Sequence, residues 1–109
     1  MTFSRIDQFE SEYQELARFA KVLSHPARLA ILRYLAEVKA CISGDISNEI
    51  PLSRTTVSQH LQVLRDAGFI LGQIDGVKIN YCLNPKMVEE FKNLVGKFLC
   101  QIDINECCK

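Results

Sequence analysis

Five cysteines carry the most reactive chemistry in this chain. A thiolate is both a nucleophile and a ligand for soft metal ions. Their number is odd and no pair has Cys-x-x-Cys spacing, so a disulfide framework is not expected in a chain long enough to form its own core. We therefore expect free thiols, with three of them close together near the C-terminal end. The five are Cys41, Cys82, Cys100, Cys107 and Cys108.

Hydroxyl, amide and basic side chains gather between residues 53 and 60. Hydroxyls and backbone N–H groups at a helix start suit phosphates, and a glutamine can make a bidentate contact to adenine. The alternative interpretation is a solvated helix face, and His60 could equally pack inside. With Lys78, these residues are the DNA-contact candidates: Ser53, Arg54, Thr55, Thr56, Ser58, Gln59 and His60.

Catalytic constellations are lacking. No glycine-rich loop or His–carboxylate set accompanies the cysteines, so the chain is not expected to be an enzyme. The alternative hypothesis of an enzyme would be a small thiol oxidoreductase. No organic cofactor is expected.

Size and charge set the limits. The 109 residues suffice for one domain, 1–109, and 48% hydrophobic with 24% charged residues is an ordinary globular composition. No apolar run approaches the roughly 18 residues of a membrane span, and residues 1–10 do not resemble a secretory signal, so we expect a cytoplasmic protein without a membrane partner. The net charge is zero, so any DNA binding must depend on a local patch and on dimerisation.

Apolar periodicity predicts the elements that position these residues. A stripe from Ile6 to Leu23 predicts a first helix, and a second runs from Pro26 to about residue 37. A loop at 38–42 precedes a short third helix, with Ser43 as its N-cap, that ends near residue 49. A fourth helix follows Ser53 as N-cap and stops at Gly68. The last two form a helix-turn-helix at about 43–67.

Beyond Gly68 the pattern alternates, which predicts two strands within about 69–83 and a turn at Asp75-Gly76. A hairpin directly behind a helix-turn-helix is a wing. Asn84-Pro85 then opens a last helix at about 86–102, followed by a cysteine-containing tail at 103–109. The fold class is mostly α with a small β-hairpin, a winged helix-turn-helix of order α-α-α-α-β-β-α.

Three segments resemble the ArsR/SmtB family of winged helix-turn-helix repressors: LSHPARLAILRYL at 23–35, LSRTTVSQHLQVLRDAGFI at 52–70 and GVKINY at 76–81. The resemblance covers roughly residues 16–98. It implies a repressor that binds an inverted-repeat operator in double-stranded DNA as a homodimer. In this family the first and last helices form the dimer, so the resemblance implies a dimer interface at the apolar residues Phe9, Tyr13, Phe91 and Phe98. The alternative is that both helices only close the core.

The family also carries a thiolate pair, Cys-x-Cys, before its third helix. Here Cys41 matches the first thiol and Ser43 replaces the second, while the last helix has no histidine for the family's zinc site. One thiolate cannot hold As(III), so we expect Cys41 to recruit two of Cys100, Cys107 and Cys108. The expected function is release of DNA on binding a thiophilic effector such as As(III). Alternatives are a redox- or persulfide-responsive repressor, and a winged-helix protein-interaction module without DNA affinity.

Overall fold

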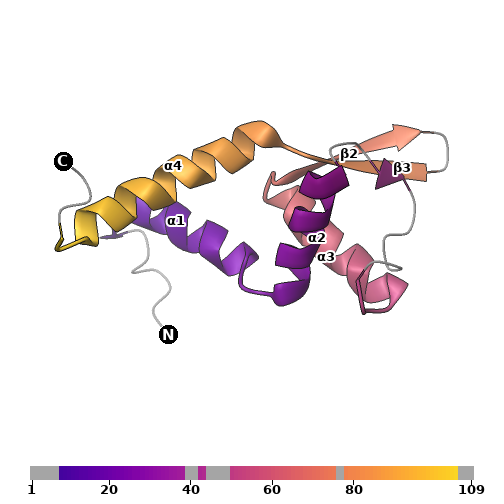
Figure 1. The fold of residues 1–109 in the computed structure, drawn as a ribbon, viewed down its shortest axis with the longest axis horizontal. Helices are drawn as coiled ribbons and strands as arrows, with labels where there is room; N and C mark the ends of the chain where they lie inside the picture. Colours follow the sequence, from indigo (N-terminus) through magenta and orange to yellow (C-terminus); the bar gives the residue numbers. More distant parts are fainter. Residues whose placement is uncertain (1–7, 39–41, 44–49, 76–77, 106–109) are drawn as a thin grey trace.

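The computed structural model describes residues 8–38, 42–43, 50–75 and 78–105 (Figure 1). In chain order the elements are α1 (Ser11–Val22), α2 (Pro26–Val38), β1 (Ile42–Ser43), α3 (Arg54–Asp66), β2 (Ile70–Asp75), β3 (Lys78–Leu83) and α4 (Pro85–Ile102). Figure 1 shows α1 and α4 together at one end, with α2, α3 and the sheet at the other. The expected winged helix-turn-helix class and the order of these four helices and the hairpin are confirmed.

Local signals set the boundaries of the helices. The α2 helix begins at Pro26, whose fixed φ and missing N–H suit a first turn. The α1 helix begins at Ser11, later than the stripe from Ile6 predicts, and residues 1–7 lie outside the described part. Its end at Val22 agrees with the prediction. The first two helices therefore meet at a short turn of three residues, 23–25.

The sheet has one strand more than the sequence analysis predicted. Ile42 and Ser43 were expected in a loop and at a helix N-cap, but they form β1, and the strand order is β1-β3-β2. Ile42 pairs with Tyr81 and Ser43 with Asn80. A two-residue strand has no alternation to detect, so pairing with β3 alone defines it. Of the predicted third helix, residues 44–49 lie outside the described residues.

The wing hairpin is shifted by one residue at its turn. Asp75 pairs with Lys78, so 76–77 connect the strands, whereas the Asp-Gly signal had predicted a turn at 75–76. The strands β2 and β3 pair antiparallel to each other, from Ile70 opposite Leu83 to Asp75 opposite Lys78. The wing thus extends from the end of α3 and returns to the start of α4.

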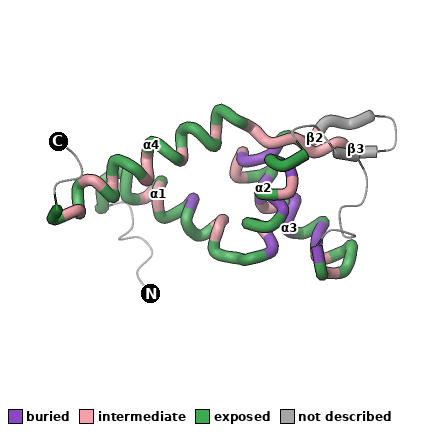
Figure 2. Tube along the Cα trace, in the orientation of Figure 1, coloured by how far each residue is buried: buried purple, intermediate pink, exposed green. Residues whose placement is uncertain are grey.

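One hydrophobic core joins α1, α2, α3 and the root of the wing. Its most buried side chains are Phe19, Ile31, Leu35, Leu64, Phe69 and Ile70. Figure 2 shows the buried positions concentrated at that end, while α4 is exposed or half-buried along its length. In the described part of the chain no helix is long and apolar enough to cross a membrane.

Candidate nucleic-acid interface

The α3 helix begins with a capped N-terminus. Ser53 Oγ accepts a hydrogen bond from the Thr56 backbone N–H at 3.2 Å, and the two hydroxyl oxygens lie 3.0 Å apart. This cap satisfies one of the amides that a helix start leaves without an intrahelical acceptor. Arg54 and Thr55 follow in the first turn, both exposed. The remaining amides at this end give it the partial positive charge that favours a phosphate.

One face of α3 is polar and exposed along most of the helix. Ser58 and Gln59, one turn beyond Thr55, are exposed as the sequence predicted. Gln62, at the next turn of the same face, is exposed as well, and its Nε2 donates to Asp66 Oδ1 at 2.8 Å. Gln62 was not among the predicted contact residues, although its spacing of three and four residues from Gln59 and Ser58 places it on the same face. The polar face therefore offers two glutamine amides.

His60 lies on the opposite, buried face of α3. It is 8% exposed and is the one polar residue of the described chain in the buried class. With Val57, Leu61 and Leu64 it forms the buried stripe at positions i, i+3, i+4 and i+7 of the helix. Packing inside was the alternative to DNA contact that the sequence left open for His60.

Two residues from the start of α2 surround the His60 ring. Arg28 Nε donates to His60 Nδ1 at 3.2 Å, and the rings of His25 and His60 have centroids 4.3 Å apart. Burial, and then the neighbouring His25 and Arg28, lower the pKa of His60. The imidazole is therefore neutral at neutral pH.

Tight packing fixes the wing relative to α3. Gly68 has φ +89°, and its carbonyl accepts from Asn84 Nδ2 at 2.9 Å, across the two ends of the hairpin. A Cβ on Gly72 of β2 would lie 3.2 Å from Arg65 Cδ, so the Arg65 side chain lies across that strand. The backbone of Lys78 is in β3, and its side chain is outside the described part. These contacts join the end of α3 to both ends of the wing.

The predicted dimer residues fall into two groups. Phe9 and Tyr13 on the α1 side are 62% and 45% exposed, and the Tyr13 ring makes an edge contact with Phe98 of α4. Phe91 instead packs edge-on against Phe19 and Phe69 within the chain. Phe91 thus contributes to the core within the chain while it stays half-buried, and its place in a dimer interface remains a prediction.

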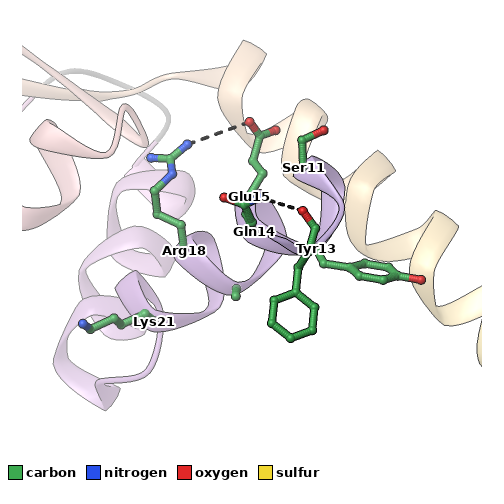
Figure 3. A pocket seen from close by; sticks show the side chains of 8 residues that line it. Ser11, Tyr13, Gln14, Glu15, Arg18 and Lys21 are labelled. Carbon is green, nitrogen blue, oxygen red and sulfur yellow. Dashed lines mark hydrogen bonds and ion pairs between the residues drawn. The ribbon is translucent and has the colours of Figure 1, made fainter. Parts of the chain in front are cut away.

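A groove of about 730 Å³ runs along the outer side of α1. Figure 3 shows its lining, with Gln14 bonded to the Phe9 carbonyl and Arg18 near Glu15. Apolar side chains on α4 are exposed too: Val88 at 41% near its start, and Leu99 at 52% and Ile102 at 56% near its end. Among the described residues, the end of the molecule formed by α1 and the last turns of α4 thus carries exposed apolar surface of the kind that marks an interface.

Two of the cysteines are not free thiols. Cys82 on β3 and Cys100 on α4 are each disulfide-bonded, contrary to the expectation of five free thiols. They belong to different bonds, because most of α4 separates them, about 20 Å at 1.5 Å per residue, and bonded cysteines have Cα atoms within about 7 Å. Cys41, Cys107 and Cys108 lie outside the described residues, and within these the structure brings together no set of three His, Cys, Asp or Glu that could hold a metal.

Comparison with known proteins agrees with this geometry. A helix-turn-helix domain family matches residues 23–73. An ArsR-like transcriptional regulator from Rhodococcus sp. RHA1 has the same fold, with a TM-score of 0.67 at 23% identity over 82% of this chain and 83% of that one. The HTH-type regulator Rv0081 of Mycobacterium tuberculosis is 34% identical over 85% of this chain and 83% of its own length. This chain belongs to the ArsR/SmtB family of transcriptional regulators.

Further relatives support a regulator of transcription. The crystal structure of Rv0081 superposes with a TM-score of 0.64 at 32% identity, covering 86% of this chain and 94% of that one. A biofilm growth-associated repressor of Xylella fastidiosa is 29% identical over 86% of this chain and 82% of its own. A possible transcriptional regulator for arsenical resistance has a TM-score of 0.61 at 29% identity, covering 76% and 83%. This regulator is a DNA-binding protein of the repressor type and not an enzyme.

Proposed function

We propose that this regulator is a homodimeric, sequence-specific repressor whose α3 helix reads the major groove of an inverted-repeat operator. The observation that supports this most is the polar, exposed face of α3, opposite a fully packed face. Ser58, Gln59 and Gln62 are the base-reading candidates, while Ser53, Arg54, Thr55 and Thr56 offer phosphate contacts at the helix start. Lys78 of the wing is a further phosphate-contact candidate.

Operator binding tests this assignment. Gln59→Ala should cost about 1–3 kcal/mol of specific affinity and leave binding to random duplex unchanged, because base contacts specify and phosphate contacts position. Gln101→Ala, an exposed glutamine at the far end of α4, is the matched control. Specific affinity should fall steeply as salt rises. Equal affinity for cognate and random duplexes at every salt concentration would contradict the proposal and favour a protein-interaction module.

The dimer partner we propose for the α1 groove is a second copy of this chain. A winged helix-turn-helix needs two recognition helices about one DNA turn apart to read an inverted repeat. The groove and the exposed Leu99 and Ile102 lie at the end opposite the sheet, so a dimer formed there leaves both α3 helices available.

Sedimentation measures this assembly. Leu99→Glu should give monomers, because the charge would be buried without a partner in the dimer. Leu29→Glu, at an equally exposed leucine on α2, should leave the dimer intact. A wild-type protein that remains monomeric at high micromolar concentration would contradict the dimer.

For the effector we propose a thiophilic species such as As(III), held by Cys41 with two of Cys100, Cys107 and Cys108. A trigonal set of thiolates suits a soft ion, and the related regulator described for arsenical resistance supports the same class of effector. Binding would couple to DNA only if the site differs between the bound and released forms, which a bridge between the chain before α3 and the end of α4 allows.

A redox-responsive repressor is the second candidate, and one specific observation favours it. Cys100, a proposed ligand, is disulfide-bonded in this structure and in that state cannot bind a metal ion. Cys82 is also disulfide-bonded, and it follows Tyr81, the partner of Ile42 in the β1–β3 ladder. Cys41 directly precedes Ile42 in the sequence, which makes it the candidate partner of Cys82 for peptide mapping under oxidising conditions.

Cys82→Ser separates the two effectors, because Cys82 is absent from the proposed metal site. Under the metalloid proposal, reduced Cys82→Ser protein still releases operator DNA with As(III), whereas Cys41→Ser does not. Under the redox proposal, peroxide or persulfide releases the wild type, and Cys82→Ser or Cys100→Ser loses that response. If Cys41→Ser and the Cys107/Cys108 double serine variant both release normally with every reagent, neither proposal holds.

A further inference from the structure

Arg28 joins the first three helices of the regulator through one guanidinium group. Its Nη1 donates to the Val22 carbonyl at the end of α1, at 2.9 Å, and its Nε donates to His60 Nδ1 inside α3, at 3.2 Å. Arg28 itself lies in the first turn of α2. The link between Arg28 and His60 spans 32 residues of sequence, so it is a tertiary contact and not part of any helix.

The hydrogen bonds also fix where the ring protons are. His60 Nδ1 accepts from Arg28, so the proton of the neutral ring is on Nε2. His25 Nδ1 accepts from the Ala27 N–H at 3.0 Å, which places its proton on Nε2 as well and makes His25 a cap for α2. The centroids of the two rings lie 4.3 Å apart. The hydrogen bond from Arg28 therefore requires the neutral form of the His60 ring.

We propose that Arg28, His25 and His60 form a neutral clamp that positions the recognition helix, and that proton uptake at His60 opens the clamp and weakens operator binding. This inference rests on the proposed DNA-reading role of α3. Arg28 and the two histidines act here as positioning residues, because none of them is on the exposed face of α3.

Protonation cannot be accommodated in the observed geometry. A proton on His60 Nδ1 would face the Arg28 Nε–H, so two donors would meet and the hydrogen bond would be lost. Burial of the ring is the largest cause that disfavours a charge on His60. The groups that face the ring, His25 from the α1–α2 turn and Arg28 from α2, disfavour that charge further.

Opening the clamp would move the polar face of α3. His60 is the buried neighbour of Ser58 and Gln59 in sequence, one residue from Gln59, and it lies between Val57 and Leu61 on the packed face. A His60 side chain driven outward by its charge would turn or tilt the helix, and the two base-reading candidates would turn with it. The neutral and protonated forms therefore differ in how they present α3 to DNA, as coupling requires.

The test measures operator affinity of the whole protein from pH 8 to pH 5.5 at constant ionic strength. Acid normally strengthens binding to DNA because it adds positive charge. We expect the wild type to lose affinity instead, and the loss should grow as the pH falls below 6.5, because the pKa of His60 is lowered from that value. The midpoint should coincide with the titration of His60 followed by NMR of the histidine ring protons.

His60→Gln is the matched variant, since its amide oxygen can accept from Arg28 but does not titrate. It should bind the operator at pH 7.5 and show no acid loss. If it does not fold, His25→Asn carries the test: Asn preserves the cap but removes one neighbouring imidazole, so the midpoint should move to higher pH.

The outcomes separate the inference from the function on which it rests. No specific operator binding at pH 7.5 by wild type would overturn the proposed function. Specific binding at pH 7.5 that is unchanged or stronger in acid would overturn the clamp alone. An acid loss of the same size and midpoint in His60→Gln would also overturn it, because His60 would then not be the group responsible. An unchanged midpoint in His25→Asn would overturn it as well, because His25 would then have no effect on the proton uptake that opens the clamp.

Discussion

Replacing Gly68 with alanine should destabilise the regulator at the junction between α3 and the wing. Gly68 has φ +89°, and a non-glycine residue in left-handed backbone costs roughly 1–2 kcal/mol. An added Cβ would also lie 2.9 Å from Met87 Cε, but that methyl is the far end of a flexible side chain and can move. We therefore expect a loss of about 1–2 kcal/mol in the free energy of unfolding, mainly from the backbone.

Gly96→Ala in α4 is the control within the same chain. No atom lies within 4 Å of its added Cβ. A glycine inside a helix is destabilising by roughly 0.5–1 kcal/mol relative to alanine, so this variant should be more stable than the wild type. The two Gly→Ala changes thus have opposite expected signs.

Urea unfolding at fixed protein concentration measures both effects, with thermal unfolding as a second readout at about 4–8 °C per kcal/mol. Gly68→Asn should lose less stability than Gly68→Ala, because asparagine tolerates left-handed backbone better. A Gly68→Ala protein as stable as the wild type would refute the reasoning. An asparagine variant that is less stable than the alanine variant would show that Met87 contact, and not φ, sets the cost.

Three further outcomes are expected. Ser53→Ala should lower the stability by about 1 kcal/mol through loss of the α3 cap, measured by urea unfolding, while Ser58→Ala changes it little. Phe91→Glu should unfold the protein rather than only separate a dimer, because its ring packs on Phe19, and circular dichroism distinguishes the two. Because the pKa of His60 is lowered from 6.5, the unfolded state takes up the proton first. The contribution of the neutral His60 ring to the free energy of unfolding should be complete above pH 6.5 and decrease as the pH falls toward the folded-state pKa. The variant His60→Gln should lack this decrease.

Much of the structure of α3 and the wing follows from local patterns. The cap at Ser53, the stop at Gly68 and the helical spacing of Val57, Leu61 and Leu64 predict α3 to within a residue. The alternating pattern likewise predicts the wing, because side chains in a strand face opposite sides with a period of two. These features depend on neighbours within a few positions, and the sequence contains those neighbours explicitly.

Other assignments depended on residues far away in the chain. A polar residue at position 60 looks exposed by type, yet it is buried because Arg28 supplies a hydrogen-bond donor across 32 residues. Phe91 looks like an interface residue by its stripe, yet Phe19 and Phe69 pack against it within the chain. Whether a polar ring is buried, and whether an apolar ring lies in the core or at the surface, both depend on which distant residues the fold places beside it.

The sequence by itself determined the family and the α3 helix with its polar face, because periodicity, capping and turn chemistry act over a few residues. Only the tertiary structure decided that β1 joins the wing as a third strand, that His60 faces Arg28 and His25, and that Cys82 and Cys100 are oxidised. Each of these is a contact between segments that the chain brings together only when the core of Phe19, Ile31 and Leu64 has packed. Such contacts leave no periodic pattern in the sequence, so the sequence does not predict them.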